Sequence, residues 1–459
     1  MSMLTVDLET MGKFDVPGPR YTSYPPATQF SEDTPREGIL DAIRRNNEAG
    51  RDLSLYFHLP FCESLCWYCG CTTVITTQHG RARTYLGHLE RELDLMGEHL
   101  NPDRIVKQMH LGGGTPTFFG PGEIETLGGM IHDRFRVSGE AEGGVEIDPR
   151  HADRPKLEAL RRVGFHRASI GVQDNNPEVQ KAVHRVQPFA LTCEVVDWIR
   201  EAGFDSLNID LIYGLPFQSV SSFEKTLDEI LTLGPDRLAI FSYAHVPWIK
   251  PAQKIFQAES LPTAETKLAI LKLTVEKLTS SGYAYIGMDH FARESDPLAV
   301  AQREKTMQRN FQGYSTAGGV DIYSFGMSSI SQVEDAYWQN EKELPAYEAR
   351  VEGRELPIQK GYLLTEDDRI RREVIMRLMC DLELDFDSMS DHLGLDFRSY
   401  FADEITSLAA LEADGLILLH EGGLSVADAG RLLIRVIAMQ FDAYLGKGQG
   451  REGRFSKVI

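Results

Sequence analysis

The chain has 459 residues, 42% of them hydrophobic, which is enough for two or three domains or for one large α/β barrel with additions. Its 48 Lys and Arg against 68 Asp and Glu give a formal net charge of −20, which makes nucleic acid a poor partner. The sequence does not open with a basic segment followed by an apolar one, and it has no apolar stretch of membrane-spanning length. We therefore expect a cytoplasmic protein without a membrane partner.

The first elements form an arm and an α/β array. The stretch VPGPRYTSYPPATQF predicts an irregular arm, and a helix is expected near residues 34–47. Six short apolar runs then alternate with amphipathic stretches of helical length. The runs are LSLYFHL, VKQMHLGGG, GVEIDP, HRASIGVQ, SLNIDLIYG and RLAIFSYAH, and the helical stretches are 85–99, 123–135, 153–163, 189–202 and 221–233. Six parallel βα units are too few for a closed eightfold barrel, so we expect an open α/β barrel.

From about residue 362 the pattern becomes mostly helical. Helices are expected at 366–381, 398–413 and 427–445, with a short hairpin, LILLHEGGLSV, before the last of them. This arrangement resembles a small winged-helix unit, and the acidic net charge favours a packing or lid role over DNA binding. We expect three parts: an arm and helix (1–50), a partial barrel with a substrate-side extension (51–360) and a helical, winged-helix-like domain (361–459).

Four of the six cysteines lie close together in HLPFCESLCWYCGC: Cys62, Cys66, Cys69 and Cys71. In the cytoplasm such thiols indicate metal or redox chemistry rather than disulfides. A structural zinc site usually joins two separated C-x₂-C pairs, and a nucleophile needs only one cysteine. Closely spaced thiolates are the usual ligands of an iron–sulfur cluster. The residues alone favour a cluster and leave zinc and a chance grouping open.

The spacing C-x₃-C-x₂-C after the first expected strand resembles the signature loop of radical S-adenosylmethionine (SAM) enzymes. The resemblance implies that Cys62, Cys66 and Cys69 bind a [4Fe–4S] cluster whose remaining iron binds SAM, and that SAM is cleaved to a 5′-deoxyadenosyl radical. The wider pattern is similar to the oxygen-independent coproporphyrinogen III oxidase family. It comprises PRYTSYP, C-x₃-C-x₂-C-x-C, GGGTPT, EIDPR, GVQD, HRVQP, NIDLIYGLP, YIGMDHFA, RNFQGYST and FSKVI, and covers nearly the whole chain. One departure is Tyr68, where the family often has Phe.

The resemblance further implies a SAM site at the ends of the strands. Its residues would be Tyr56, Tyr68, Gly113, Gly114, Thr115, Glu146, Gln173, Arg185, Asp210, Ala244 and Ile330. Carboxylates suit ribose hydroxyls, and Arg suits the methionine carboxylate. Ala244 and Ile330 would lie near adenosine or near a second SAM molecule, but plain core packing is the alternative for both, and spacing alone does not select them. For Tyr56 the alternative is a half-buried strand tyrosine, and most lone triple glycines are simple turns.

On the substrate side the resemblance implies Cys71, Glu146, Phe311 and Gln312. For Cys71 the alternative is a small buried hydrophobic residue. The implied reaction removes the carboxyl groups of two propionates of coproporphyrinogen III and leaves the vinyl groups of protoporphyrinogen IX, in porphyrin and haem biosynthesis.

This oxidoreductase would need a low-potential electron donor and an electron acceptor, neither of which the sequence identifies. We expect a monomer. The alternatives are a haem-binding chaperone or haem-degrading relative on the same scaffold and, in a different class, a zinc-loop interaction protein without chemistry.

Overall fold

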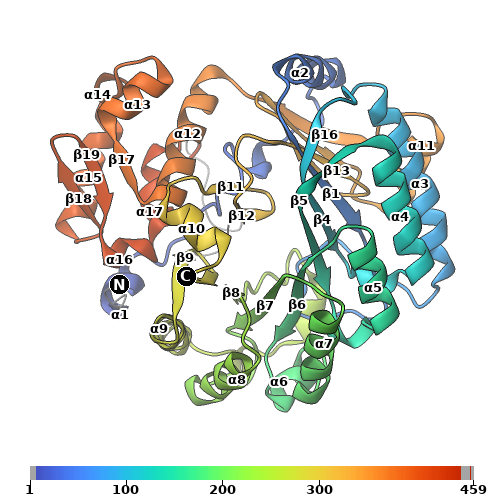
Figure 1. The fold of residues 1–459 in the computed structure, drawn as a ribbon. Helices are drawn as coiled ribbons and strands as arrows, with labels where there is room; N and C mark the ends of the chain where they lie inside the picture. Colours follow the sequence, from blue (N-terminus) through green and yellow to red (C-terminus); the bar gives the residue numbers. More distant parts are fainter. Residues whose placement is uncertain (1–6, 446–454, 456–459) are drawn as a thin grey trace.

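A 12-stranded mixed sheet dominates the computed structural model, which describes residues 7–445 and residue 455. Six neighbouring strands of this sheet are parallel: β1 (Leu53–Leu59), β4 (Ile105–Gly113), β5 (Arg136–Ile147), β6 (Arg167–Gln173), β7 (Ser206–Tyr213) and β8 (Arg237–Ser242). The helices on their outer face are α3 (Gly80–Gly97), α4 (Pro121–Arg134), α5 (Arg154–Arg162), α7 (Phe189–Glu201) and α8 (Val220–Thr232), as Figure 1 shows. The expected open α/β barrel is confirmed, with small shifts at the helix ends.

Further strands extend the parallel array at both edges. Beside β1 lie the parallel strand β13 (Asp321–Phe325) and then the antiparallel strands β14 (Ile330–Gln332), β15 (Ala336–Asn340) and β16 (Ile358–Leu363). Beyond β8 lie the antiparallel strands β10 (His290–Arg293) and β9 (Tyr283–Gly287). A separate hairpin consists of β11 (Gln308–Asn310) and β12 (Gly313–Ser315). The accompanying helices are α2 (Arg36–Ala49), α9 (Ala264–Ser280), α10 (Pro297–Arg303) and α11 (Leu344–Glu352).

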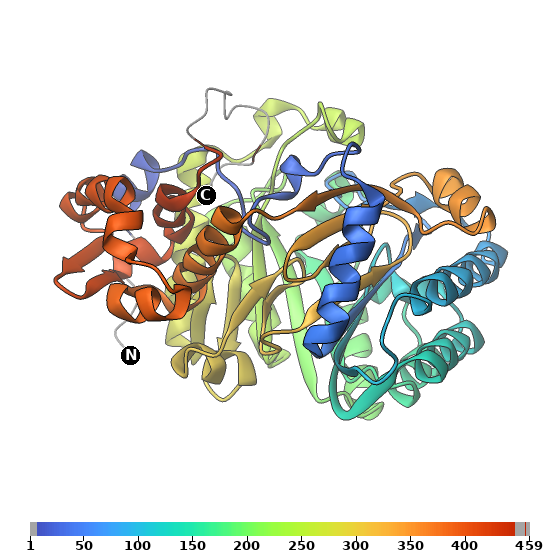
Figure 2. The same ribbon diagram turned by 90° about the horizontal axis from the view of Figure 1, so that it is seen from above.

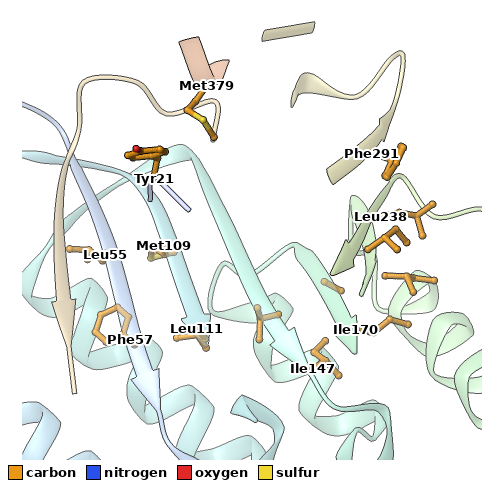
Figure 3. Close-up of a cluster of buried hydrophobic side chains, with 14 of the residues drawn as sticks. Tyr21, Leu55, Phe57, Met109, Leu111, Ile147, Ile170, Leu238, Phe291 and Met379 are labelled. Atoms are coloured by element: carbon orange, nitrogen blue, oxygen red, sulfur yellow. The ribbon is translucent and has the colours of Figure 1, made fainter. Parts of the chain in front are cut away.

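The strands separate an apolar outer face from a polar interior. Successive side chains of a strand face opposite sides of the sheet. On β1, Leu55 and Phe57 are fully buried under the helices, and Ser54 and Tyr56 face the other side. The outward-facing apolar residues continue across the neighbouring strands, where Figure 3 shows Met109, Leu111, Ile147 and Ile170. Burying each such side chain stabilises the fold by about 1.5–3 kcal/mol.

The C-terminal part is mostly helical, as expected, and lies beside the barrel (Figure 1). Helix α12 (Glu366–Asp381) agrees with its predicted range, and the expected hairpin is present as β18 (Ile417–His420) and β19 (Gly423–Val426). A third strand, β17 (Glu383–Asp385), pairs with β19, and helix α13 (Phe386–Leu393) follows it. The division of the chain near residues 50 and 360 stays a prediction.

Two of the expected C-terminal helices are wrong in extent. The range 398–413 is divided at Phe401 (φ −107°, ψ 30°) into α14 (Phe397–Tyr400) and α15 (Ala402–Ala413). The range 427–445 contains only α16 (Asp428–Arg431), α17 (Ile434–Ala438) and a short 3₁₀ turn. The backbone leaves the helical region at Leu433, which brings the buried Arg435 within hydrogen-bonding distance of the Pro19 carbonyl (2.8 Å). Tertiary contacts with the arm therefore override local helix propensity.

The N-terminal arm connects the C-terminal part to the barrel. Helix α1 (Leu8–Lys13) ends where Lys13 Nζ lies 2.5 Å from Asp414 Oδ1. Tyr21 is buried and donates a hydrogen bond to Asp442 (2.9 Å), and Ser31 pairs with Gly361 at the edge of the sheet. Figure 2 shows this segment running from the C-terminal elements to α2. In the part of the chain that the structure describes, no helix is both long and apolar enough to cross a membrane.

Candidate functional site

The barrel interior holds a polar cavity of about 210 Å³. Its lining comes from the inward-facing positions of the parallel strands and from the β11–β12 hairpin. The polar residues along it include Gln108, His110, Glu142, Glu146, Ser169, Asn208, Asp210 and Gln312. Glu146 and Asp210 lie where this cavity approaches the carboxyl ends of the strands. Functional groups of parallel barrels gather at that end.

The thiol loop follows β1 at the same end of the barrel. Its start, β2 (Phe61–Cys62), pairs with β3 (Val74–Ile75), and a turn brings the Cys69 amide 3.0 Å from the Cys66 carbonyl. Cys66 is buried, Cys62 and Cys69 are half-buried, and Cys71 is exposed. A hydrogen bond between the Cys69 and Cys71 side chains lowers the pKa of Cys69 to about 6, whereas burial raises the pKa of Cys62 to about 12. The loop thus holds one thiol that ionises readily before any metal binds.

Two guanidinium groups lie against this loop. Arg150 Nη2 is 3.4 Å and Arg185 Nη1 is 3.6 Å from the sulfur of Cys66. Both also bind Asp148 Oδ2, at 2.7 and 2.9 Å. Burial opposes the ionisation of Asp148, but the charges and hydrogen bonds of Arg185 and Arg150 outweigh it and lower the pKa of this carboxyl. Arg150 and Arg185 thus place N–H donors beside the sulfur of Cys66 and are themselves held by Asp148.

The glycine loop after β4 is tightly packed against the thiol loop. Gly113 has φ +113°, and a Cβ there would lie 2.7 Å from the His58 ring. A Cβ on Gly114 would lie 2.6 Å from the backbone of Pro60 and Phe61. The Thr115 amide donates to the Phe61 carbonyl (2.9 Å). These glycines are therefore required by the packing of the protein itself, in addition to any closeness to a ligand.

Glu146, at the end of β5, lies beneath this loop. Its Oε2 accepts a hydrogen bond from the Gly113 amide (3.2 Å), and its Oε1 lies 3.5 Å from His110 Nε2. Burial disfavours the charge of Glu146, but contacts with His110 and the Gly113 amide bring its pKa below the usual value. Tyr56 stacks on His110 with ring centroids 5.9 Å apart. Tyr56, Gly113 and Glu146 therefore lie together, and their role in binding SAM stays a prediction.

The ends of β6 and β7 contribute the next polar groups. Gln173 has φ +72°, and its Oε1 is buried without a hydrogen-bond partner in the described part of the chain. Arg185 Nη2 donates to the Gly171 carbonyl (2.6 Å), whereas its buried Nε has no partner among the described residues. Asp210 accepts hydrogen bonds from Asn208 (2.7 Å) and Ser169 (3.1 Å), and burial raises its pKa to about 7. Gln173 Oε1 and Arg185 Nε are therefore two buried polar atoms that a polar ligand could satisfy.

The remaining expected cofactor residues are more dispersed. Tyr68 packs against an apolar cluster that includes Tyr243, and its carbonyl accepts a hydrogen bond from Gln253 (3.2 Å). Ala244 is exposed just after β8. Ile330 is half-buried at the start of β14, on the opposite side of the parallel array. Ala244 and Ile330 therefore lie at distant positions in the order of the sheet, and the structure does not join them in one site.

The substrate-side pair Phe311–Gln312 forms the turn of the β11–β12 hairpin. Gln312 lines the interior cavity, and its Nε2 lies 3.4 Å from Ser54 Oγ. Phe311 instead packs edge-on against Phe30 of the arm and Tyr337, with ring centroids 6.4 and 5.8 Å away. The hairpin thus brings Gln312 to the barrel interior and uses Phe311 for packing.

Several residues near the site were not selected from the sequence. They are His110, Asp148, Arg150, Arg167, Ser169, Asn208 and Arg237. A signal for most of them is present, because polar residues recur at every second position of the strand runs, as in SLNID and HRASIG. Asp148 and Arg150 lie within the EIDPR motif itself.

The residues present suit a thiolate-bound cluster with a polar organic ligand beside it. Cys62, Cys66 and Cys69 lie on one loop, next to cationic groups and next to the unpartnered atoms of Gln173 and Arg185. Within residues 7–445, no three His, Cys, Asp or Glu side chains converge as ligands of a single metal ion. The donor set is the thiolate set that iron–sulfur clusters use.

Comparisons with known proteins agree with this site. A sequence model of the radical SAM superfamily matches residues 56–230, and one of the HemN C-terminal domain matches residues 364–433. The chain is 45% identical over 455 residues to the oxygen-independent coproporphyrinogen III oxidase of Pseudomonas aeruginosa, which covers 99% of this chain and 98% of that protein. It is 46% identical over 453 residues to the Escherichia coli protein of the same name, with the same coverage.

The fold shows the same relationship. The solved structure titled as coproporphyrinogen III oxidase (HemN) from Escherichia coli, a radical SAM enzyme, matches with a TM-score of 0.92 and 44% identity, over 97% of this chain and all of that one. The open barrel and its thiol loop therefore define a radical SAM enzyme, whose cofactors are a [4Fe–4S] cluster and SAM. Within that class, the chain belongs to the oxygen-independent coproporphyrinogen III oxidase family.

Proposed function

We propose that the chain converts coproporphyrinogen III to protoporphyrinogen IX by oxidative decarboxylation of two propionates, in anaerobic porphyrin and haem biosynthesis. The observation that carries the proposal is full-length similarity to relatives that bear the name of this activity. In each step the propionate loses a β-hydrogen atom, carbon dioxide and one further electron, and a vinyl group remains. Bound together, the cluster and SAM supply the removal of the hydrogen atom, and an external acceptor takes the electron.

Cys62, Cys66 and Cys69 are the proposed cluster ligands, and the loop keeps them at the carboxyl end of the barrel. Guanidinium N–H groups of Arg150 and Arg185 lie against the sulfur of Cys66 and would fix its position for ligation. Arg185 also fixes the Asp148 side chain through an ion pair of 2.9 Å. These contacts hold the ligands in position and leave one side of the loop to SAM.

SAM is proposed to bind along the strand ends beside the loop. Asp210 would accept a hydrogen bond from a ribose hydroxyl, and Arg185 would interact with the methionine carboxylate through its unpartnered Nε. Glu146 would face the positively charged part of the ligand. The other proposed contacts are Tyr56, Tyr68, Gly113, Gly114, Thr115, Gln173, Ala244 and Ile330.

The substrate is proposed to contact Cys71, Glu146, Phe311 and Gln312. Gln312 is the best supported of these, because it lines the interior cavity below Glu146. Cys71 is exposed, and its carbonyl accepts a hydrogen bond from Lys250 (3.0 Å). It would serve the reaction side of the loop, by packing against substrate or by delivering a hydrogen atom or proton, and would not ligate iron.

The remaining partners are also proposals. The enzyme would act as a cytoplasmic monomer, without nucleic acid or membrane, and would receive electrons from a low-potential donor. The net charge of −20 supports the exclusion of nucleic acid. Light scattering of the reconstituted protein tests the monomer, and a mass of twice 51.5 kDa would contradict it.

One anaerobic assay tests the function. The reconstituted protein is incubated with SAM, a chemical reductant and coproporphyrinogen III, and we expect protoporphyrinogen IX with two deoxyadenosines per product. Omission of SAM is the control. Deoxyadenosine formation without any loss of carboxyl groups would contradict the proposed substrate while leaving the radical SAM assignment intact.

A further inference from the structure

A second, larger cavity lies at the opposite end of the barrel. It has a volume of about 680 Å³ and is formed by the amino-terminal ends of the strands and the loops around residues 293–297 and 316–320. It shares Glu142, Arg167, Ser206 and Arg237 with the interior cavity. These four residues therefore form the boundary between the two cavities, which we call the neck.

The neck contains two arginines held by carboxylates. Arg237 binds Asp296 through Nε and Nη2, each 2.8 Å from Oδ1, and both side chains are more than nine-tenths buried. Arg167 forms an ion pair with Glu142, whose other oxygen accepts a hydrogen bond from Gln108 (3.0 Å). The Nε of Arg167 is buried and has no hydrogen-bond partner among the described residues.

The buried Nε of Arg167 is a donor that an added anion would satisfy. Burial and the nearby charge of Arg237 lower the pKa of Arg167, while Glu142 partly offsets this effect. The outer cavity carries both signs of charge, since Lys107 and Arg293 line it together with Asp205 and Asp236. Arg167 and Arg237 both line the neck, and guanidinium groups are the preferred partners of carboxylates.

The position of the neck determines which carboxylate of the proposed substrate it can bind. Glu142 and Glu146 are four residues apart on β5, about 13 Å along an extended strand. The carbon that reacts must lie at the cofactor end, near Glu146, and the carboxyl group that leaves is attached next to it. The neck is too distant for that group, but it is within reach of another side chain of the same macrocycle.

We propose that Arg167 and Arg237 form a carboxylate subsite that binds a retained propionate of the porphyrinogen, an inference that rests on the proposed substrate. The macrocycle would enter through the larger cavity at the amino-terminal ends of the strands. Binding a propionate that does not react would orient the ring so that a reactive propionate lies beneath Glu146. Arg167 and Arg237 are positioning residues in this arrangement.

The test measures equilibrium binding of three stable porphyrins by fluorescence. Coproporphyrin III carries all four propionates, protoporphyrin IX carries only the retained two, and coproporphyrin III tetramethyl ester carries no carboxylate. For Arg167→Gln and Arg237→Gln we expect the affinity for both acids to fall roughly ten- to hundredfold. Affinity of both variants for the ester should stay the same. A variant that had lost its structure would bind the ester more weakly as well.

Two further variants complete the test. Arg104→Gln breaks an equally buried ion pair, with Asp321, that lines neither cavity, and it should leave porphyrin affinity unchanged. Glu142→Gln removes the carboxylate that competes for Arg167, and affinity for the acids should rise several-fold. This last variant keeps the test decisive if Arg167→Gln does not fold.

Three results would overturn the proposed carboxylate subsite itself, and a fourth would overturn its assignment to a retained propionate. The three are unchanged acid affinity in folded Arg167→Gln, an equal loss for acids and ester, and unchanged or weaker acid binding by Glu142→Gln. A loss confined to coproporphyrin III would assign the neck to a propionate that reacts and would also overturn the retained-propionate subsite. Failure of the parent to convert coproporphyrinogen III is a separate result, which would contradict the proposed function and not porphyrin binding at the neck.

Discussion

The two ends of the barrel differ in how their polar groups are held. At the carboxyl end, Gln173 Oε1 and Arg185 Nε are buried without partners in the described part of the chain, and four thiols lie on a single loop. At the amino end, Arg167 and Arg237 are each engaged by a carboxylate, and of these two side chains only Arg167 keeps a buried nitrogen, Nε, without a partner among the described residues. The carboxyl end is arranged to receive cofactors, whereas the amino end is largely satisfied by the protein and can exchange one carboxylate for another.

A search for sequence motifs therefore finds the carboxyl end of such a site and misses the amino end. Cofactor groups at the carboxyl end lie in short, recognisable loops such as CESLCWYC and GGGT. The residues of the amino end are single positions on separate strands, brought together by the curvature of the sheet. Variants that act at one end and not at the other test whether the two ends differ in this way.

The largest effect is expected from the thiols at the carboxyl end. Serine at Cys62, Cys66 or Cys69 should remove most of the cluster absorbance and all reductive SAM cleavage, because each removes a proposed iron ligand. Cys71→Ser should keep its cluster and cleave SAM, yet form little protoporphyrinogen. The four variants are compared after identical anaerobic reconstitution.

An opposite outcome at Cys71 would change the assignment. If Cys71→Ser lost the cluster as completely as the other three variants, all four thiols would be ligands and SAM would have no open iron. In air, the parent protein should bleach, because an iron without a protein ligand is open to oxidants. Stoichiometric iron and sulfide after long aerobic handling would contradict the open site.

The next effect concerns the two ends of a single strand, β7. Asp210→Ala at its carboxyl end should weaken SAM binding roughly ten- to hundredfold, the loss of about 1.5–3 kcal/mol for a hydrogen bond to a charged group. Asp205→Ala, just before the amino end of the same strand, is the matched control and should bind SAM like the parent. Equal SAM affinity in all three proteins, by anaerobic equilibrium dialysis, would remove Asp210 from the site.

A smaller effect is expected from Glu92, which supports the carboxyl end from outside the barrel. Its carboxyl group accepts hydrogen bonds from the Gly326 amide (2.7 Å), Asn340 (2.6 Å) and Tyr347 (2.7 Å). Burial raises the pKa of Glu92 from 4.5 to about 7. Between these values the folded state keeps the proton that the unfolded state has lost, so the free energy of unfolding falls as pH rises.

The size of this effect can be measured by urea unfolding. Between pH 5 and pH 7 the parent should lose about 2 kcal/mol of stability through this group, and Glu92→Gln should lack that loss. Tyr347→Phe removes one hydrogen bond without a titrating group, so it should keep the pH dependence. Identical pH profiles for the parent and Glu92→Gln would show that another group is responsible.

The smallest effect is expected far from both ends of the barrel. The ion pair between Lys13 and Asp414 is partly exposed, with 58% of the lysine side chain accessible. Lys13→Ala should therefore lower the stability by less than about 1 kcal/mol, and added salt should reduce even that difference. A loss as large as that expected for Glu92 would mean that the arm depends on this contact far more than its exposure indicates.

Sequence patterns predicted the parallel strands, because their apolar runs and helical stretches alternate regularly. The clustered thiols stand out in the sequence itself, whereas the roles of Glu146, Gln173 and Asp210 came from the family resemblance and stay predictions. The break in the range 427–445 was not predicted, because Arg435 binds the Pro19 carbonyl of the arm, 416 positions away. The neck was missed for the same reason: nothing local joins Arg167 to Arg237.

The path of the arm has a consequence for the order in which the protein is made. Tyr21 donates a hydrogen bond to Asp442, which lies 421 positions later in the chain. The Pro19 carbonyl accepts one from Arg435, which lies 416 positions later. During synthesis the barrel strands emerge well before these partners do, and contacts between such distant positions form late. The contacts of the arm with Arg435 and Asp442 can therefore form only when nearly all of the chain has left the ribosome.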